Sequence, residues 1–138
     1  MYLKGLFFVK VLLLILFVSC GGMSADDYLH EGQRSMRKQR TDEAFKYFEK
    51  AIEKDPSFSQ AYVERARIFF VRGNIDEALE DFTKAIELDP ENSDAYYGRG
   101  RLFQFRNNMP AACEDWVKAR DLNHHNIEEA LHMCRAYL

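Results

Sequence analysis

The sequence lacks an excess of basic residues. Its 138 residues include 19 lysines and arginines against 22 aspartates and glutamates, which gives a formal net charge of -3. If residues 1–19 are left out, Lys4 and Lys10 are removed with them, so 17 basic residues stand against 22 acidic ones and the net charge becomes -5. A protein that binds nucleic acid needs a basic surface to neutralise phosphates. The composition therefore argues against nucleic acid as a partner.

The sequence motifs of common enzyme classes are also missing. There is no glycine-rich phosphate loop, no nucleophile elbow and no pair of catalytic carboxylates. Three histidines and a cysteine lie close together near the end of the chain, but their spacing matches no common zinc pattern. We therefore expect no cofactor, no metal and no catalytic activity. The four residues are His124, His125, His132 and Cys134.

The apolar run near the start of the chain is too short to cross a bilayer. A spanning helix needs about 20 apolar residues, whereas this run covers 11–18 and Lys10 interrupts the wider stretch. A secretory signal fits such a segment better. The segment ends in Phe17-Val18-Ser19-Cys20. This ending resembles the lipobox of bacterial lipoproteins, in which a signal peptidase cuts before the cysteine and the thiol receives a diacylglycerol.

The resemblance implies a signal peptide over 1–19, and a lipidated Cys20 with a short tether over 20–24. The alternative is an uncleaved signal anchor in which Cys20 is a buried cysteine, and both alternatives place the folded part outside the cytoplasm. Each buried methylene contributes about 0.8 kcal/mol, so two or three acyl chains, such as palmitate, give lasting attachment. The tether spans at most about 14 Å. We therefore expect the folded domain to lie next to the membrane.

The chain does contain a 34-residue pattern, which is clearest in the window 59–92. Its first half has apolar residues at the i, i+4 and i+7 spacing of one helix face, and its second half repeats that spacing. Gly73 separates the two halves, and Pro90 ends the second because proline cannot continue a helix. The window therefore predicts a helical hairpin. Its expected core face comprises Tyr62, Ala66, Phe69, Ala78, Phe82 and Ala85.

Residues of the same kind recur 34 positions earlier and 34 positions later, which indicates an array of three hairpins. The pattern resembles the tetratricopeptide repeat (TPR). The resemblance implies an all-α, right-handed superhelix with hairpins over 25–58, 59–92 and 93–126, and a concave groove lined by the first helix of each hairpin. The recurring residues are Tyr28, Gly32, Ala44, Phe48 and Ala51 in the first hairpin, and Tyr96, Gly100, Phe103, Ala112, Trp116 and Ala119 in the third.

An apolar stripe over 127–138 predicts a capping helix on the end of the array, as solubility requires. Cys113 occupies a position that packs toward the following helix, and Cys134 lies in that helix at a position of close approach. Either the two cysteines form a disulfide, which would stabilise the fold by about 3 kcal/mol in the chain-entropy model, or they are free buried thiols. The stripe comprises Ile127, Ala130, Leu131, Cys134, Tyr137 and Leu138.

The concave face is where we expect a partner to bind. Arg67 and Arg101 are 34 residues apart, so they should stack along the groove, with Gln33 completing the row. Apolar side chains beside these cations suit an extended or helical peptide whose carboxylate an arginine can hold in a bidentate manner. Alternatively, both arginines pair with nearby acids such as Glu64 or Asp94 and only keep the groove soluble. The expected groove residues are Gln33, Val63, Arg67, Phe70, Tyr97, Arg101, Gln104 and Phe105.

These expectations favour a membrane-anchored scaffold or adaptor that binds a protein or peptide partner in the bacterial cell envelope. One alternative is a structural subunit that self-associates through its first repeat, which no cap precedes. A remote alternative is an enzyme or metal carrier that uses the histidine cluster. Some TPR proteins bind the C-terminal carboxylates of chaperones with lysine and asparagine side chains in the groove. At the equivalent positions of this sequence only Arg101 is a residue of that kind, so we do not expect a chaperone tail as the partner. The equivalent positions hold Leu29, Gln33, Arg67, Tyr97 and Arg101.

Overall fold

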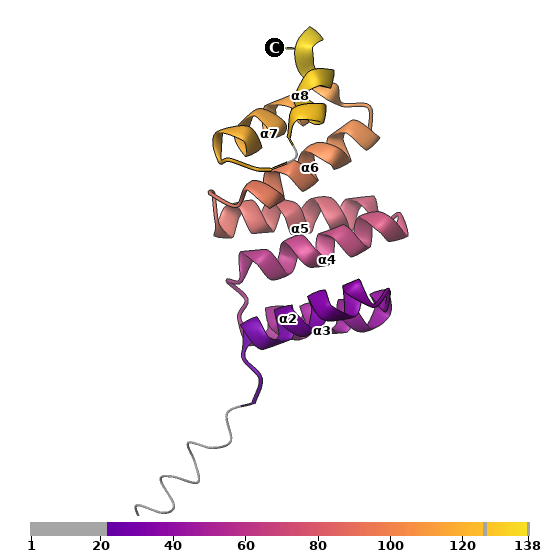
Figure 1. The fold of residues 1–138 in the computed structure, drawn as a ribbon, viewed down its shortest axis with the longest axis vertical. Helices are drawn as coiled ribbons and strands as arrows, with labels where there is room; N and C mark the ends of the chain where they lie inside the picture. Colours follow the sequence, from indigo (N-terminus) through magenta and orange to yellow (C-terminus); the bar gives the residue numbers. More distant parts are fainter. Residues whose placement is uncertain (1–21, 126, 138) are drawn as a thin grey trace, which may run out of the picture.

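The computed structural model describes residues 22–125 and 127–137, and its elements are helices. Within this part, six helices form three antiparallel hairpins that stack along one axis, with shorter helical pieces at the C-terminal end (Figure 1). The expected all-α solenoid of three hairpins is confirmed. The elements are α2 (Ala25–Arg37), α3 (Thr41–Lys54), α4 (Ser59–Arg72), α5 (Ile75–Leu88), α6 (Ser93–Phe105), α7 (Met109–Asp121), α8 (Glu128–Met133) and the 3-10 helix η1 (Cys134–Ala136).

The expected signal peptide over 1–19 and the lipidation site Cys20 lie outside the described residues. Among the residues that are described, no helix is both long enough and apolar enough to cross a membrane.

Each hairpin turns through one residue in the left-handed conformation. In the middle hairpin this residue is Gly73, with φ of 81°, and its N–H donates to the carbonyl oxygen of Phe70. The predicted break at Gly73 is confirmed. The equivalent residues, 34 positions before and after, are Gln39 and Asn107, with φ of 60° and 59°. The turn geometry is thus the same in all three hairpins, although only glycine adopts it without steric cost.

The core follows the predicted alternation of large and small residues. Phe48, Phe82 and Trp116, from the second helix of each hairpin, are at most 1% exposed. Gly32 and Gly100 lie opposite two of these rings, and a Cβ at either position would collide with Phe48 or Trp116. The small residues on the first helices therefore set how closely the two helices of a hairpin approach.

Two residues of the expected core face lie at the edge of the core. Tyr62 and Phe69 are only partly buried, and they pack against the cluster that Ala66, Ala78 and Phe82 form. The helical period correctly groups these residues on one face, but the two aromatic rings flank that face and remain in contact with solvent.

The first hairpin presents a polar surface at the N-terminal end of the array. On α4, Ala61 and Ile68 are buried in one cluster with Phe48 of the preceding hairpin. The residues of α2 at the same positions are Asp27 and Arg34, and both are exposed. The face of α2 that would receive a preceding hairpin is therefore hydrophilic at these two positions.

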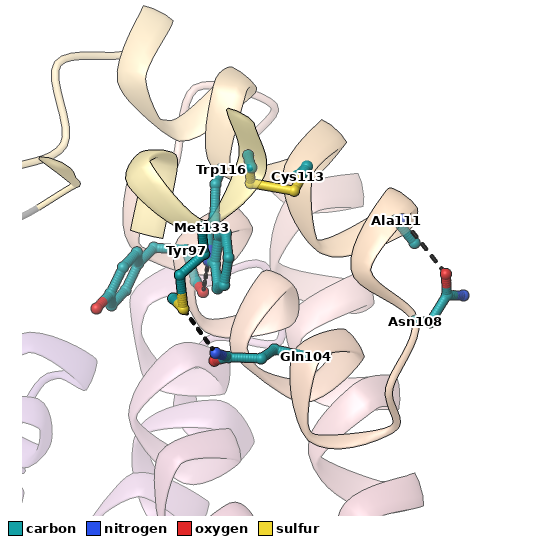
Figure 2. The surroundings of a disulfide bond; sticks show 8 residues. Tyr97, Gln104, Asn108, Ala111, Cys113, Trp116 and Met133 are labelled. Atoms are coloured by element: carbon teal, nitrogen blue, oxygen red, sulfur yellow. Dashed lines mark hydrogen bonds between the residues drawn. A yellow bond between two sulfur atoms is a disulfide. The ribbon is translucent and has the colours of Figure 1, made fainter. Parts of the chain in front are cut away.

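The C-terminal end is closed by α8 and η1, which pack on α7. Cys113 of α7 and Cys134 of η1 form a disulfide with a Cα–Cα distance of 5.5 Å (Figure 2). Of the two alternatives left open by the sequence, the structure has the disulfide. Ile127, Ala130 and Cys134 are buried in one cluster with Ala112 and Trp116 of α7.

The prediction of one capping helix over 127–138 is wrong in its extent. The chain forms α8 and then a 3-10 turn, because helix ends often tighten into 3-10 geometry. Tyr137, expected on the buried stripe, is 52% exposed. Leu138 lies outside the described residues.

Candidate functional site

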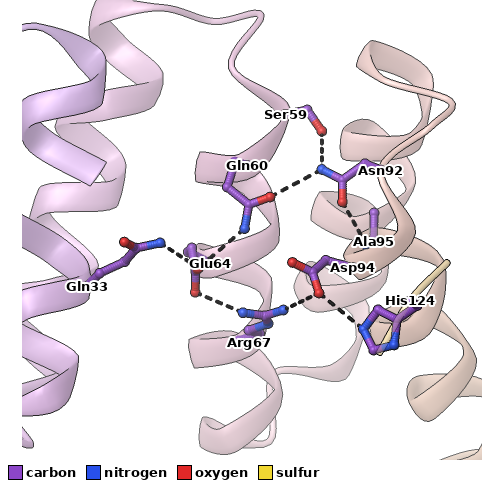
Figure 3. Close-up of polar contacts among 9 residues, drawn as sticks. All are labelled: Gln33, Ser59, Gln60, Glu64, Arg67, Asn92, Asp94, Ala95 and His124. Carbon is purple, nitrogen blue, oxygen red and sulfur yellow. Dashed lines mark hydrogen bonds and ion pairs between the residues drawn. The ribbon is translucent and has the colours of Figure 1, made fainter. Parts of the chain in front are cut away.

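A continuous chain of polar contacts crosses the first helices of all three hairpins (Figure 3). The amide of Gln33 on α2 donates to Glu64 on α4, with a nitrogen–oxygen distance of 3.1 Å. The other oxygen of Glu64 lies 3.3 Å from Arg67, whose second nitrogen lies 3.2 Å from Asp94 on α6. The same oxygen of Asp94 is 3.2 Å from Nε2 of His124. Arg67 therefore pairs with an acid on each side, Glu64 and Asp94. For Arg67 this agrees with the alternative in which the arginines pair with nearby acids.

A second set of contacts fixes the start of α6 against the middle hairpin. The side chain of Asn92 accepts a hydrogen bond from the backbone N–H of Ala95 and donates to the hydroxyl of Ser59 at 2.8 Å. That hydroxyl in turn donates to the carbonyl oxygen of Ala85 at the end of α5. These bonds join the start of α6 to the start of α4 and the end of α5.

Arg101 differs from Arg67, although it occupies the same position one repeat later. Within residues 22–125 and 127–137 it forms no ion pair, and its side chain is exposed. Its guanidinium lies over the ring of Phe70, 5.6 Å from the ring centroid. Arg67 pairs with Glu64, which lies one turn earlier on α4. The residue one turn before Arg101 on α6 is Gly98, which has no side chain to pair with. Arg101 thus presents an uncompensated positive charge to the groove.

A cavity of about 390 Å³, called the groove cavity below, lies beside Arg101 between α4 and α6. Gly98 contributes no side chain to it, so the space reaches down to the ring of Phe82, against which Gly98 packs. The cavity brings together four of the expected groove residues. It is lined by Arg67, Phe70, Val71, Phe82, Asp94, Tyr97, Gly98, Arg101, His124 and His125.

A second cavity of about 260 Å³, called the cap cavity below, continues the groove toward the C-terminus. The C-terminal cap forms one of its sides, where Met133 accepts a hydrogen bond from the amide of Gln104 through its sulfur at 3.3 Å (Figure 2). Trp116 forms its base and donates to the carbonyl oxygen of Tyr97. Its lining comprises Tyr97, Arg101, Gln104, Trp116, Glu129, Ala130 and Met133.

His124 is a mostly buried residue of the groove cavity's lining. Its ring is stacked on Tyr97, with 4.3 Å between ring centroids, and on His125 at 5.0 Å. The residue is 8% exposed, and Nδ1 has no hydrogen-bond partner in the described part of the chain. Burial lowers the pKa of His124, although the nearby carboxylate of Asp94 acts in the opposite direction. The imidazole is therefore a neutral donor to Asp94 at neutral pH.

The histidine cluster does not form a metal site in the described residues. Cys134 is bonded to Cys113, and no group of three or more histidine, cysteine or acidic side chains there is arranged to hold a metal ion.

Family models identify the 34-residue pattern. The model described as TPR repeat matches residues 66–104, and two models described as tetratricopeptide repeat match residues 47–80 and 28–58. The repeats are tetratricopeptide repeats. The resemblance stated from the sequence is thereby confirmed for the repeats.

Solved structures share this TPR fold. The first TPR of Spaghetti (RPAP3) bound to the HSP90 peptide SRMEEVD is 23% identical, with a TM-score of 0.73 over 83% of this chain and 90% of that chain. The TPR domain of Arabidopsis OM64 is 21% identical, with a TM-score of 0.75 over 83% and 97%. YrrB, described as a TPR protein with an unusual peptide-binding site, is 27% identical, with a TM-score of 0.67; the match covers 82% of this chain and 58% of that chain. A comparison with curated proteins found no match.

Three of the expected groove residues line neither cavity. Val63 is completely buried, in one cluster with residues of α6, so it belongs to the core and cannot contact a ligand. Gln33 is occupied by its bond to Glu64 and lines neither cavity. Phe105 is 63% exposed at the rim, where its ring meets that of Phe70 edge-on at 5.8 Å.

Proposed function

We propose that this chain is a membrane-anchored TPR scaffold or adaptor that binds a protein or peptide partner in the bacterial cell envelope through its concave groove. The observation that carries the proposal is the uncompensated guanidinium of Arg101 beside the groove cavity. Ligand pockets in proteins measure about 300–1,000 Å³, and at about 390 Å³ the groove cavity lies within that range. The proposed activity is binding without catalysis.

The side chains around Arg101 suit a peptide. Phe70 and Tyr97 offer ring surfaces that can bury an apolar side chain. Arg101 can hold a carboxylate with two parallel hydrogen bonds. Arg67 could do so only by giving up its contacts with Glu64 and Asp94. The groove is therefore suited to one principal carboxylate next to an apolar side chain.

The structural relatives support a peptide as the ligand. One of them is described as bound to an HSP90 peptide and another as having a peptide-binding site. The support for the envelope location is the lipobox-like ending at Cys20 and the apolar run before it.

Self-association through the first repeat is the less favoured alternative. The outer positions of α2 that would join a second array are Asp27 and Arg34, where α4 has Ala61 and Ile68. Two such polar surfaces would bury charges instead of apolar side chains, which opposes association.

The proposal is tested by affinity capture with the full chain from detergent-solubilised native membranes. We expect Arg101→Glu to lose the partner that the unchanged protein captures, because the reversed charge repels the carboxylate. Arg120→Glu is the matched control, since Arg120 is an exposed arginine on α7 that pairs with its neighbour Asp121. Circular dichroism should show equal helicity for both variants. Equal capture by both variants would remove the groove from the proposal.

A further inference from the structure

The groove cavity and the cap cavity share one wall. Tyr97 and Arg101 line both, so an extended ligand that lies along α6 would pass over these two side chains and reach into a cavity on each side. The chemistry of the two cavities differs, because different charges remain unpaired in each of them.

Most of the surface of the groove cavity is apolar. Its two charged residues besides Arg101 are Arg67 and Asp94, which pair with each other. What remains toward the open space is mainly ring and aliphatic surface, including Val71, which is 81% exposed. Burial of apolar surface is the favourable term there.

The cap cavity has opposite charges that do not pair. Arg101 and Glu129 both line it, yet they form no ion pair with each other or with any other residue in the parts of the chain that the structure describes. The amide of Gln104 lies in the same lining. Two opposite charges on either side of an open space can each bind a complementary charge of one ligand.

We propose that the groove selects a peptide segment with three features in a fixed order: an apolar side chain in the groove cavity, a carboxylate on Arg101 at the wall, and a basic side chain on Glu129 in the cap cavity. This inference rests on the proposed function, and it names the class of partner. The acidic residue lies in the middle because Arg101 borders both cavities.

The proposal makes the C-terminal cap part of the binding site. Glu129 and Met133 belong to α8, and the bond between Cys113 and Cys134 fixes the element that follows α8 to α7. Selection of the basic side chain therefore depends on a cap that the repeats themselves do not supply.

The test is selection from a random dodecapeptide display library on the full-length protein, followed by affinity measurement with the enriched peptides. We expect enrichment of apolar, acidic and basic residues in that order along the groove. Glu129→Lys should enrich an acidic residue in place of the basic one and weaken binding of the original peptides about tenfold. Arg101→Glu should enrich a basic residue in place of the acidic one. Glu128→Lys, the neighbouring glutamate that does not line the cap cavity, is the matched control and should select the original pattern.

The possible results separate this inference from the proposed function. Peptides that require Arg101 but show no preference for a basic residue would overturn the inference and leave the groove as the binding site. An unchanged pattern with Glu129→Lys would also overturn it. If no peptide is enriched on the unchanged protein, both the inference and the peptide-binding function are contradicted.

Discussion

The guanidinium of Arg65 donates to both carboxylate oxygens of Asp81, from Nε at 2.7 Å and from Nη2 at 2.8 Å. These hydrogen bonds raise the pKa of Arg65, and burial opposes them only in part. The guanidinium also lies over the rings of Tyr62 and Phe69, at 5.6 and 5.7 Å from their centroids. The two rings at the edge of the core thus contact this guanidinium.

The same arrangement recurs in the third hairpin, where Arg99 donates two hydrogen bonds of 2.8 Å to Asp115. In the first hairpin the equivalent positions hold Glu31 and Tyr47, so it has no such pair. There, Lys50 of α3 lies over the ring of Tyr28 of α2, 5.8 Å from the ring centroid. The middle and third hairpins thus share a bond between their two helices that the first replaces with a weaker contact.

Removal of Asp81, the partner of Arg65, should destabilise the middle hairpin. Asp81→Ala leaves a largely buried guanidinium without its carboxylate, so we expect the free energy of unfolding to fall by about 2–4 kcal/mol. Urea unfolding followed by circular dichroism measures this. Asp121→Ala, which removes an exposed partner of Arg120, should change stability by less than about 0.5 kcal/mol. Similar values for the two variants would contradict the role of the pair.

Glycine at the first turn should stabilise the fold. Gln39 has φ of 60°, and a residue with a Cβ is strained in that conformation. We expect Gln39→Gly to raise the free energy of unfolding by about 0.5–1 kcal/mol, as measured by thermal and urea unfolding. Asn107→Gly should give a smaller gain, because asparagine tolerates this conformation better. A larger gain at position 107 would argue against strain at Gln39.

Removal of the disulfide should loosen the cap. The bond joins residues 21 positions apart, and a loop of that length contributes about 3 kcal/mol in the chain-entropy model. We expect the variant with both Cys113→Ala and Cys134→Ala to unfold at a lower temperature. A reductant should lower the melting temperature of the unchanged protein and leave that of the variant unaltered. No response of the unchanged protein to the reductant would contradict the prediction.

Acidification should destabilise the groove through His124. Its pKa is lowered below 6.5 in the folded protein, so just below pH 6.5 the unfolded chain binds more protons than the folded one. The stability that this histidine confers is present above pH 6.5 and is lost as the pH falls through the folded pKa. Urea unfolding at pH 7.5 and 5.5 should show a smaller decrease for His124→Gln than for the unchanged protein. His132→Gln, at an exposed position, should retain the full decrease.

Cys20 should carry the lipid. Growth with radiolabelled palmitate should label the unchanged protein, and Cys20→Ser should abolish the label and release the protein from the membrane fraction. The variant that lacks Cys113 and Cys134 should keep its label, because those residues lie in the folded domain. An unlabelled wild-type protein would contradict the lipobox interpretation.

The fold could be predicted because its determinants are local and repeated. Small and aromatic residues recur at helical spacing, and Gly73 and Pro90 mark where the helices of the middle hairpin end. The cap was less predictable, because helix ends are poorly determined by the apolar spacing and because that spacing left the pairing of Cys113 with Cys134 open.

The groove was predicted less completely because its surface depends on neighbouring helices. The helical period places Val63 next to the groove face, but contact with the following hairpin buries it. The difference between Arg67 and Arg101 was visible only in the residues one turn earlier, Glu64 and Gly98. Their effect on the two arginines required the distances between helices.

The hydrophilic outer side of α2 and the bonded cap at the other end also determine how this array could be lengthened. A further unit joined before Ala25 would meet Asp27 and Arg34, and one joined after Cys134 would have to displace a covalently attached element. Both surfaces of the window 59–92 match a neighbouring hairpin, so duplication of that window extends the molecule from within. A longer version of this protein would therefore grow at its middle, with both of its present ends unchanged.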